Sequence, residues 1–519
     1  MNRAIQIEKI KSGHLWDIFV IGGGATGLGI AVDAASRGYS VALAEKTDFA
    51  KGTSGRSTKL VHGGVRYLAQ GNVKLVMEAL KERTILLKNA PHITKIQTFI
   101  VPAYSWWDMF FYGVGLTVYN LLAGKHKLEG VKWLSLTATL KQLPQLNETG
   151  LKGGISYCDG QFDDARLAIN LAQTATDNGA SVVNHLEVVN LIVEGKKIAG
   201  VVLKDEVSGE SFSVKAKVVI NATGVFADNI MKLEDASSRK MISPSQGIHL
   251  VIDKQFFTGN AALMVPKTSD GRVLFIVPWH HQLVIGTTDT KVYNISEEPI
   301  ALEEEINFLL THFNKYSTKP IALEDVKSAF AGLRPLIKSS NISATSLLSR
   351  EHTIVISAGG LLTIAGGKWT TYRKMAKDAI QNAIFIGKLE KRECVTENLE
   401  IHGYAKEVLV QDVYTAYGSD KVFLMALIEE NPVLSEKIHP NYPYTKVQIV
   451  WAVKEEMAIS LEDVLSRRVR LLIEDARAAL EAAPLVAEIM ANILGKNQDW
   501  INLECERFEK IASTYIINA

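Results

Sequence analysis

The apolar and polar positions of the chain follow three patterns, and each predicts a different kind of structure. Near the start, an apolar run at 17–21, a helical pattern at 25–37 and a second apolar run at 40–44 predict strand, helix and strand. Between residues 245 and 334 apolar and polar positions alternate in short runs, which favours an antiparallel sheet. From about residue 388 the pattern becomes helical, with helices expected at 404–417, 421–429, 446–457, 461–483 and 485–494.

The turn between the first strand and the first helix carries the fingerprint of a dinucleotide site. Gly22, Gly24 and Gly27 follow the strand at once, and Glu45 comes directly after the second strand. These glycines permit a tight turn, close approach of a pyrophosphate and close packing of helix on strand. The helix N-terminus offers N–H groups to the phosphates, and Glu45 is placed to accept hydrogen bonds from a ribose. By itself the motif fits NAD or FAD, but the regular strand–helix repeats of nicotinamide dehydrogenases do not follow it.

Composition and charge remove several classes of function. A chain of 519 residues is too long for one compact core, so we expect two or three domains. The formal net charge of +1 gives no reason to expect nucleic-acid binding. The three cysteines lack the spacing of a disulfide framework or a zinc site, so we expect no metal and a reducing compartment. Residues 1–14 lack the apolar core of a signal peptide, which favours a cytoplasmic location.

Residues 103–123 form an aromatic-rich stretch that is nearly long enough to span a bilayer and carries a single charge, Asp108. A preceding proline and two internal glycines argue against a spanning helix. The interpretation we favour is a buried helix that covers part of a pocket. The alternative is a peripheral membrane contact through residues 104–112, with these side chains at the lipid interface: Trp106, Trp107, Phe110 and Phe111.

The segment after Glu45, residues 46–67, is dense in glycine and hydroxyl residues. Small residues of this kind can lie flat against a cofactor and bind it through the backbone. The second half of the segment carries Lys59, His62 and Tyr67 around two glycines, which is unusual for a surface linker. This segment therefore predicts a further wall of the cofactor site.

Residues 361–371 repeat the order of buried strand, glycine turn and helix. A second anion or electron-rich group is therefore expected at the N-terminus of that helix. Asp163 and Asp164 precede a helical pattern at 165–178, and we interpret both carboxylates as helix caps only.

Seven motifs, in order along the chain, are similar to those of one enzyme family. They stand at residues 22–27, 58–67, 159–166, 221–224, 286–289, 332–335 and 366–373. Together they resemble the FAD-dependent glycerol-3-phosphate dehydrogenases, a family of D-amino-acid-oxidase-like flavoproteins. The segment 460–468 in the helical part is also similar to that family. Any one motif could arise by chance, whereas seven in order over most of the chain are specific.

The resemblance implies an enzyme that oxidises sn-glycerol 3-phosphate to dihydroxyacetone phosphate, passing hydride to FAD and electrons to a membrane quinone. It also implies an α/β fold with a Rossmann-like FAD-binding domain, an antiparallel-sheet substrate domain and a C-terminal all-helical domain. The expected FAD-binding domain is discontinuous, and the expected boundaries are 1–100, 151–244 and 335–387 for FAD binding, 101–150 and 245–334 for the substrate or cap domain, and 388–519 for the helical domain.

The positions that match the family's substrate-binding residues are Arg66, Tyr67, Arg334, Arg350 and Lys368. A phosphate monoester carries close to two negative charges, and arginine can bind two of its oxygens at once. We expect Arg334 and Arg350 to hold the phosphate, with Arg66 and Tyr67 nearer the glycerol. Lys368 is expected beside the flavin, where it would stabilise negative charge on the reduced ring.

The cofactor is expected to be bound without a covalent link, because no cysteine or histidine stands out as a tether. The resemblance places the FAD contacts in the glycine-rich segments and in the turn that follows the strand ending at residue 221. The expected contacts are Gly22, Gly24, Ala25, Thr26, Gly27, Glu45, Thr53, Ser54, Ser57, His62, Gly63, Gly64, Ala222, Gly224, Gly366, Gly367, Lys368 and Thr370.

Oxidation at C2 also requires removal of the proton of the 2-hydroxyl group, and a histidine suits this task near neutral pH. His249 and His62 are the candidates, since both lie in segments that match the family, and His249 is the stronger one. His62 is flanked by glycine and has the alternative role of orienting the flavin. His280 and His281 are interpreted as residues of a hairpin tip.

Two other functions remain open at this point. One is a glycerophosphate oxidase of the same fold that uses oxygen and releases hydrogen peroxide. Such oxidases tend to carry an insertion for which this chain is too compact. The other is a flavin-binding redox sensor without catalysis. For the dehydrogenase we expect a peripheral location on the inner face of the cell membrane, and the sequence leaves the oligomeric state open, a homodimer included.

Overall fold

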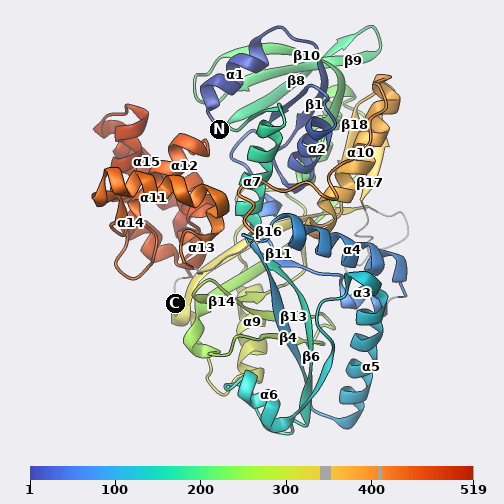
Figure 1. The fold of residues 1–519 in the computed structure, drawn as a ribbon, viewed down its shortest axis with the longest axis vertical. Coiled ribbons are helices and arrows are strands. Elements are labelled where there is room, and N and C mark those ends of the chain that lie inside the picture. Colours follow the sequence, from blue (N-terminus) through green and yellow to red (C-terminus); the bar gives the residue numbers. More distant parts are fainter. Residues whose placement is uncertain (70, 339–351, 407–411, 518–519) are drawn as a thin grey trace.

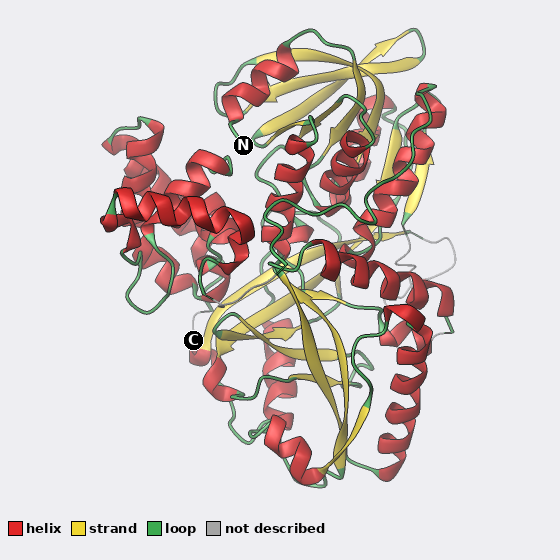
Figure 2. Ribbon diagram, in the orientation of Figure 1, coloured by secondary structure: helices red, strands yellow, loops and turns green. Residues whose placement is uncertain are grey.

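The computed structural model describes residues 1–69, 71–338, 352–406 and 412–517 (Figure 1). It contains two large sheets, one above the other in Figure 2, and a group of helices at one side. Arg350 lies outside the described residues, and the side chain of Arg66 is likewise outside the description. Among the described residues, none of the helices combines the length and the apolar character needed to cross a membrane.

The first sheet has eight strands and carries the predicted dinucleotide unit. Its order is β17-β18-β10-β1-β2-β7, with β8 and β9 attached beside β10. The strands that flank β1 pair with it in parallel, so the expected order of strand, helix and strand is confirmed. The strands are β1 (Trp16–Ile21), β2 (Val41–Ala44), β7 (Ser181–Val183), β8 (Leu186–Glu194), β9 (Lys197–Asp205), β10 (Ser211–Asn221), β17 (Thr353–Ile356) and β18 (Leu362–Ala365).

Helices cover both faces of this sheet because its central strands are apolar on both sides. On one face the small residues of α2 let α7 and α10 pack beside it in one core. On the other face α1 packs on the strands, together with β8 and β9. These helices are α1 (Arg3–Lys11), α2 (Ala25–Ser36), α7 (Asp164–Asp177), α8 (Ala227–Glu234) and α10 (Tyr372–Gly387).

The second sheet has ten strands and is largely antiparallel, as the alternating pattern predicted. Its order is β15-β11-β14-β13-β12-β4-β6-β3, with β16 beside β11 and β5 beside β6. The strands are β3 (Leu60–Val61), β4 (Thr94–Ala103), β5 (Lys132–Ser135), β6 (Gly153–Phe162), β11 (Ile242–Asp253), β12 (Ala262–Val265), β13 (Leu274–Trp279), β14 (Gln282–Gly286), β15 (Thr290–Lys291) and β16 (Val326–Ile337). The domain boundaries stay a prediction. Strands β4 and β6 both belong to this sheet, although most of β4 and all of β6 lie within 1–100 and 151–244, which we expected to bind FAD.

Five helices belong to the same part of the fold as the second sheet: α3 to α6, and α9. They are α3 (Val65–Ala69), α4 (Val73–Asn89), α5 (Trp106–Leu122), α6 (Leu136–Gln142) and α9 (Glu303–Tyr316). The expectation of a buried helix holds for one face of α5, which packs Met109 and Leu116 into the core. It is wrong for the other face, where Trp106 and Trp107 are 71% and 70% exposed.

The C-terminal part is helical, as expected, and Figure 1 shows it in orange and red beside α7. Its helices are α11 (Lys421–Glu430), α12 (Lys446–Glu455), α13 (Leu471–Glu474), α14 (Ala476–Leu494) and α15 (Gln498–Ser513). The helix expected at 404–417 is wrong for its described residues, which form turns and part of a short 3₁₀ helix, Thr415–Asp420. Residues 407–411 of that prediction lie outside the described part.

The prediction of one helix over 461–483 is also wrong, because the helix is interrupted within that range. A π-helical turn spans Asp463–Arg468, and Arg470 then adopts a left-handed conformation with φ 65° before α13. The predicted break at residue 484 is wrong as well, since Pro484 lies within α14. Several buried residues of this stretch are arginines whose partners lie in another part of the chain.

Candidate active site

A cavity of about 1080 Å³ connects the dinucleotide turn with the second sheet. Residues of both glycine turns, of segment 46–67 and of the strands β11 and β16 line it. Most of the residues predicted to bind the cofactor therefore share one space. His249, Arg334 and Lys368 line the same cavity, so the predicted catalytic and substrate groups lie in it as well.

The dinucleotide turn is built so closely that side chains would not fit. Gly22 has φ 108°, and a Cβ on it would lie 2.8 Å from the carbonyl oxygen of Ala222. A Cβ on Gly27 would lie 1.9 Å from the carbonyl oxygen of Gly22, so Gly27 serves the packing of α2 rather than the cavity wall. Gly24 has no side chain to cap α2 and lines the cavity. The open end of α2 therefore fits the pyrophosphate of a dinucleotide.

Glu45 lies where the sequence predicted, at the end of β2 and in the cavity wall. Its Oε2 accepts a hydrogen bond from the backbone N–H of Gly23 at 2.6 Å, and its Oε1 accepts one from Thr47 N–H at 2.9 Å. Oε1 also accepts a bond from the Thr47 hydroxyl at 3.0 Å, so these contacts leave open the second lone pair of Oε2. Glu45 is thus fixed in orientation and can still accept a bond from a ribose hydroxyl.

The two glycine-rich segments meet in the structure. The hydroxyl of Thr370 accepts a hydrogen bond from the backbone N–H of His62 at 3.2 Å. The Nζ of Lys368 lies 3.7 Å from the centre of the Tyr67 ring. The turn at 366–367 has φ of 80° and 79°, which glycine adopts without strain. The side chains of Tyr67 and Lys368 are therefore neighbours, and the backbone of His62 lies against Thr370 of the second glycine turn.

His249 lies on β11 and is 3% exposed. Its Nε2 is 2.8 Å from the hydroxyl oxygen of Thr58, and its ring stacks on Phe330 with 4.8 Å between centres. Burial, followed by the positive charges of Lys59 and Arg334, lowers the pKa of His249 well below its usual range. The imidazole is consequently neutral at physiological pH, which is the form that can accept a proton.

Arg334 lies on β16 and is held by groups of the neighbouring strands. Its Nη2 donates to the carbonyl oxygen of Thr288 at 2.7 Å, and its Nη1 donates to the carbonyl oxygen of Gln246 at 3.1 Å. Asp289 lies 3.4 Å away as an ionic partner. These contacts fix the guanidinium at the cavity wall, and the predicted phosphate contact of Arg334 stays a prediction.

Some predicted cofactor contacts are engaged with the protein. Gly63 does not line the cavity, and its N–H donates to the Tyr119 hydroxyl at 2.8 Å. The N–H and hydroxyl of Ser57 both donate to Asp164, at 3.0 and 2.7 Å. Thr53, Ser54, Ala222 and Gly224 line the cavity as expected.

Three residues shape this region in ways that the sequence did not show: Thr58 received no role there, and Lys59 and Asp164 were noted without their partners. Lys59 is fully buried, its Nζ binds Asp164 at 2.6 Å, and burial, only partly offset by Asp164, lowers its pKa to about 8. The assignment of capping alone is wrong for both aspartates. Asp164 binds Lys59, and Asp163 accepts the capping bond from Arg166 N–H but also lies 3.4 Å from His280 Nε2 and 3.6 Å from Arg470 Nε. The sequence analysis noted their motifs, 58–67 and 159–166, but a sequence does not show that these two segments contact each other in the fold.

A glycine turn at the open end of a helix, a second glycine turn and an antiparallel sheet around one cavity define an FAD-dependent oxidoreductase. The family described as FAD dependent oxidoreductase matches residues 17–373, and the C-terminal domain of alpha-glycerophosphate oxidase matches residues 361–500. FAD is the cofactor of this class, and the glycine cradle fits it.

The relatives narrow the class to one family. Mitochondrial glycerol-3-phosphate dehydrogenase of Mesocricetus auratus is 37% identical over 99% of this chain and 75% of its own length. The Homo sapiens protein of that name is 38% identical over 96% and 73%. The FAD complex of glycerol-3-phosphate dehydrogenase from Bacillus halodurans has a TM-score of 0.82 at 28% identity, covering 99% of this chain and 98% of that chain. The chain belongs to the FAD-dependent glycerol-3-phosphate dehydrogenase family.

Proposed function

We propose that this chain oxidises sn-glycerol 3-phosphate to dihydroxyacetone phosphate and passes the electrons to a membrane quinone. The observation that carries the proposal is the single cavity that joins the dinucleotide turn to a region with one neutral histidine and several cations. The relatives that match almost the whole chain bear the name of this activity.

The cations of the cavity suit a phosphorylated substrate. Transferring a phosphate monoester out of water is unfavourable unless several donors replace the water. Arg334 at the cavity wall is one donor, and from their motifs we assign Arg350 to the phosphate as well and Arg66 to the glycerol end. Tyr67 and Lys368, stacked on each other, are assigned to the glycerol part and to the neighbourhood of the flavin.

The chemistry requires that C2 lose a hydride while the 2-hydroxyl loses a proton. Bound FAD supplies the two-electron acceptor for the hydride. We assign the proton to His249, which lines the cavity and whose Nε2 lies 2.8 Å from the hydroxyl oxygen of Thr58, another residue of the lining. His62, which contacts Phe275 edge-on at 6.1 Å between centres, is assigned to orienting the flavin.

The exposed face of α5 supports two parts of the proposal: a membrane quinone as the electron acceptor, and a peripheral position of the protein on the membrane. Phe110 and Phe111 are each 56% exposed, and Trp106 and Trp107 extend the same apolar face. Phe110 and Phe111 also line the cavity, so one helix borders both the active site and the outer surface. Aromatic side chains at a membrane interface are favourable because the apolar ring is buried while polar atoms stay hydrated.

The test of the substrate is an anaerobic titration of the FAD-loaded protein with glycerol 3-phosphate, followed at the visible flavin absorbance. Bleaching with one equivalent of substrate is expected, and glycerol should leave the spectrum unchanged at the same concentration. A flavin that stays oxidised would support the redox sensor and overturn the proposal.

The acceptor needs a second experiment, because the C-terminal match carries the description of an oxidase domain. Reduced protein is mixed in a stopped-flow instrument with air-saturated buffer or with an anaerobic ubiquinone or menaquinone analogue. Fast reoxidation by the quinone and slow reoxidation by oxygen are expected. Fast reoxidation by oxygen with release of hydrogen peroxide would instead assign the chain as an oxidase.

A further inference from the structure

The C-terminal helical part meets the flavin domain through a row of buried arginines. Arg467, Arg468 and Arg470 are each 2% exposed and follow one another across the break between the π-helical turn and α13. Buried guanidinium groups need ionic partners, since an unpaired buried charge is strongly destabilising. Their partners identify what this row does.

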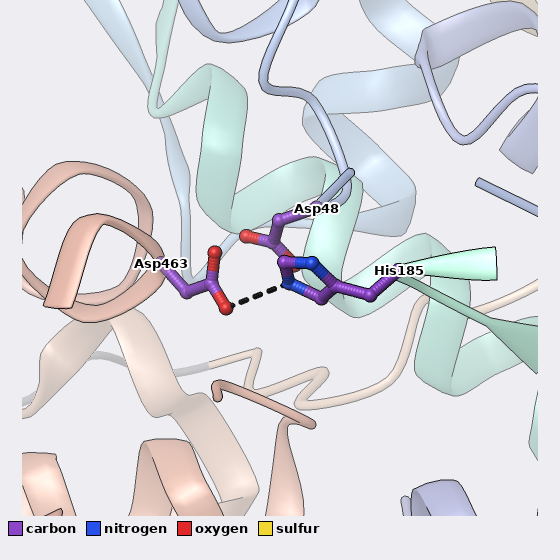
Figure 3. A group of neighbouring side chains, drawn as sticks. All are labelled: Asp48, His185 and Asp463. Atoms are coloured by element: carbon purple, nitrogen blue, oxygen red, sulfur yellow. Dashed lines mark hydrogen bonds and ion pairs between the residues drawn. The ribbon is translucent and has the colours of Figure 1, made fainter. Parts of the chain in front are cut away.

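Asp48, from the segment after β2, is the first partner. It is fully buried and accepts a hydrogen bond from Arg467 Nε at 2.6 Å and two from Arg468, at 2.7 and 3.0 Å. Figure 3 shows Asp48 beside His185 and Asp463, and His185 Nε2 lies 3.0 Å from Asp463. These three residues have the composition of a metal site, but arginines already neutralise both carboxylates, so we interpret the group as an ion-pair cluster.

Asp164, at the start of α7, is the second partner. Its Oδ1 accepts from Arg470 Nη2 at 2.8 Å, while its Oδ2 accepts from Lys59 Nζ at 2.6 Å and from the Ser57 hydroxyl at 2.7 Å. Lys59 Nζ and Arg470 Nη2 also donate to the carbonyl oxygen of Gly55, at 2.9 and 3.3 Å. This carboxylate thus connects the C-terminal part to the end of a short loop.

That loop, residues 46–59, is the wall between the dinucleotide turn and the second sheet. The hydroxyl of Ser54 accepts a bond from the backbone N–H of Ala25 at the start of α2, and the Thr53 hydroxyl donates to the carbonyl oxygen of Leu333 on β16. Ten of its residues line the cavity, the first being Lys46 and the last Thr58. A Cβ on Gly55 would lie 2.5 Å from the carbonyl oxygen of Ala50, so the loop has one tight shape.

We propose that the C-terminal helical part is a positioning element of the cofactor site, whose buried arginines hold loop 46–59 in the shape that receives FAD. Asp48 fixes the beginning of the loop and Asp164 fixes its end, so the loop is ordered before the cofactor arrives. Binding to a preordered loop avoids the entropy of ordering it on contact. Arg467, Arg468 and Arg470 are positioning residues, since they act on the cofactor through the loop.

The test compares Arg468→Met with a matched control at the same boundary, Arg166→Met. Arg166 is 2% exposed and binds Glu456 of the C-terminal part at 2.8 Å, and among the described residues none of its side-chain bonds reaches loop 46–59. Three quantities are measured: the FAD dissociation constant by flavin fluorescence, amide hydrogen exchange of loop 46–59, and the unfolding temperature.

Arg468→Met is expected to weaken FAD binding about tenfold or more and to speed exchange in the loop. Arg166→Met is expected to lower the unfolding temperature similarly and to change the FAD dissociation constant by less than about twofold. Equal loss of FAD affinity in both variants, or unchanged exchange in the loop of Arg468→Met, would overturn the proposal.

Arg468→Lys covers the case in which Arg468→Met does not fold. It keeps the charge beside Asp48 but cannot make both bonds, so FAD affinity is expected to fall between the wild-type and Met values. Wild-type affinity in a folded Arg468→Lys protein, with a loop that exchanges faster, would likewise reject the proposal. All three measurements are made without glycerol 3-phosphate, so their outcome is independent of the substrate assignment.

Discussion

Two regions of one cavity, the dinucleotide turn and the region around His249, are built in opposite ways. The turn comes from one continuous stretch that ends at Glu45, and it presents backbone groups at the N-terminus of α2. The other region takes its side chains from segments that are far apart in the sequence, with Thr58, His249, Arg334 and Lys368 each on a different element. A continuous motif survives changes elsewhere in the fold, whereas an assembled site depends on both sheets and on what holds them together.

The two regions also handle charge differently. At the turn, N–H groups and a helix end offer partial positive charge without burying an ion. Around His249 the protein buries Lys59 beside Asp164 and places Arg334 beside Asp289. Burial and the charges of Lys59 and Arg334 keep His249 neutral, and each of these two cations has a carboxylate partner. Four variants sharpen this contrast.

The largest effect is expected at the dinucleotide turn, from Gly27→Ala. The added Cβ would sit 1.9 Å from the carbonyl oxygen of Gly22, and backbone on both sides cannot yield. FAD binding, measured by flavin content after purification, should be lost by about a hundredfold or more. Gly130→Ala is the control, because a Cβ there would meet no described atom within 4 Å. Normal flavin content in Gly27→Ala would contradict the close packing described for the turn.

The next effect belongs to His249, through His249→Asn. Loss of a general base should slow flavin reduction by glycerol 3-phosphate by roughly 10²–10⁴-fold, measured by anaerobic stopped-flow. His281→Asn, at the exposed hairpin tip, is the control and should reduce flavin at the wild-type rate. A wild-type rate in His249→Asn would remove this histidine as the base.

The same rate also has a predicted pH dependence. The base is active when neutral, so the rate should fall as the pH drops through the pKa of His249. Burial, Lys59 and Arg334 lower that pKa, which places the midpoint below the ordinary histidine value near 6.5 and leaves a plateau at neutral pH. A midpoint above pH 7 would show that the bound state is less buried or less positive than described.

A smaller effect is expected from Lys368→Met, which removes the cation stacked on Tyr67. We expect kcat/KM for glycerol 3-phosphate to fall by roughly tenfold to a hundredfold, because charge in a site closed to water is poorly screened. Lys267→Met makes the same charge change at an exposed position that lines the cavity, and it should alter kcat/KM by less than about twofold. Equal effects of the two variants would assign the role to general electrostatic attraction.

The smallest effect on the chemistry is expected from the double variant Trp106→Ser and Trp107→Ser on α5. Flavin reduction should be unchanged, while binding to lipid vesicles, measured by co-sedimentation, should fall severalfold. Phe385→Ser removes an 85% exposed aromatic side chain from α10 and should leave vesicle binding unchanged. Full vesicle binding by the double variant would reject α5 as the membrane contact.

The predictions from sequence held where the signal was local. The parallel unit from β1 to β2 was predicted correctly, because its glycines, strands and terminal acid stand within one stretch. The 461–483 helix failed, because arginines at 467, 468 and 470 satisfy partners that lie about 300 residues or more away. The buried interpretation of α5 failed on one face for a related reason, since an apolar pattern does not show which surfaces the rest of the fold will cover.

The sequence by itself determined the class of cofactor and the family, because a series of motifs in order along the chain can be identified without the fold. Only the tertiary structure decided how those groups are paired. It brings the Thr58 hydroxyl to His249 Nε2 and joins the two glycine-rich segments. It also shows that Asp164 links the cofactor loop to the C-terminal part. The physical reason is that the role of a buried charge depends on its ionic and hydrogen-bond partners. When these partners are far apart in the chain, the packing of whole sheets and helices determines which of them come together.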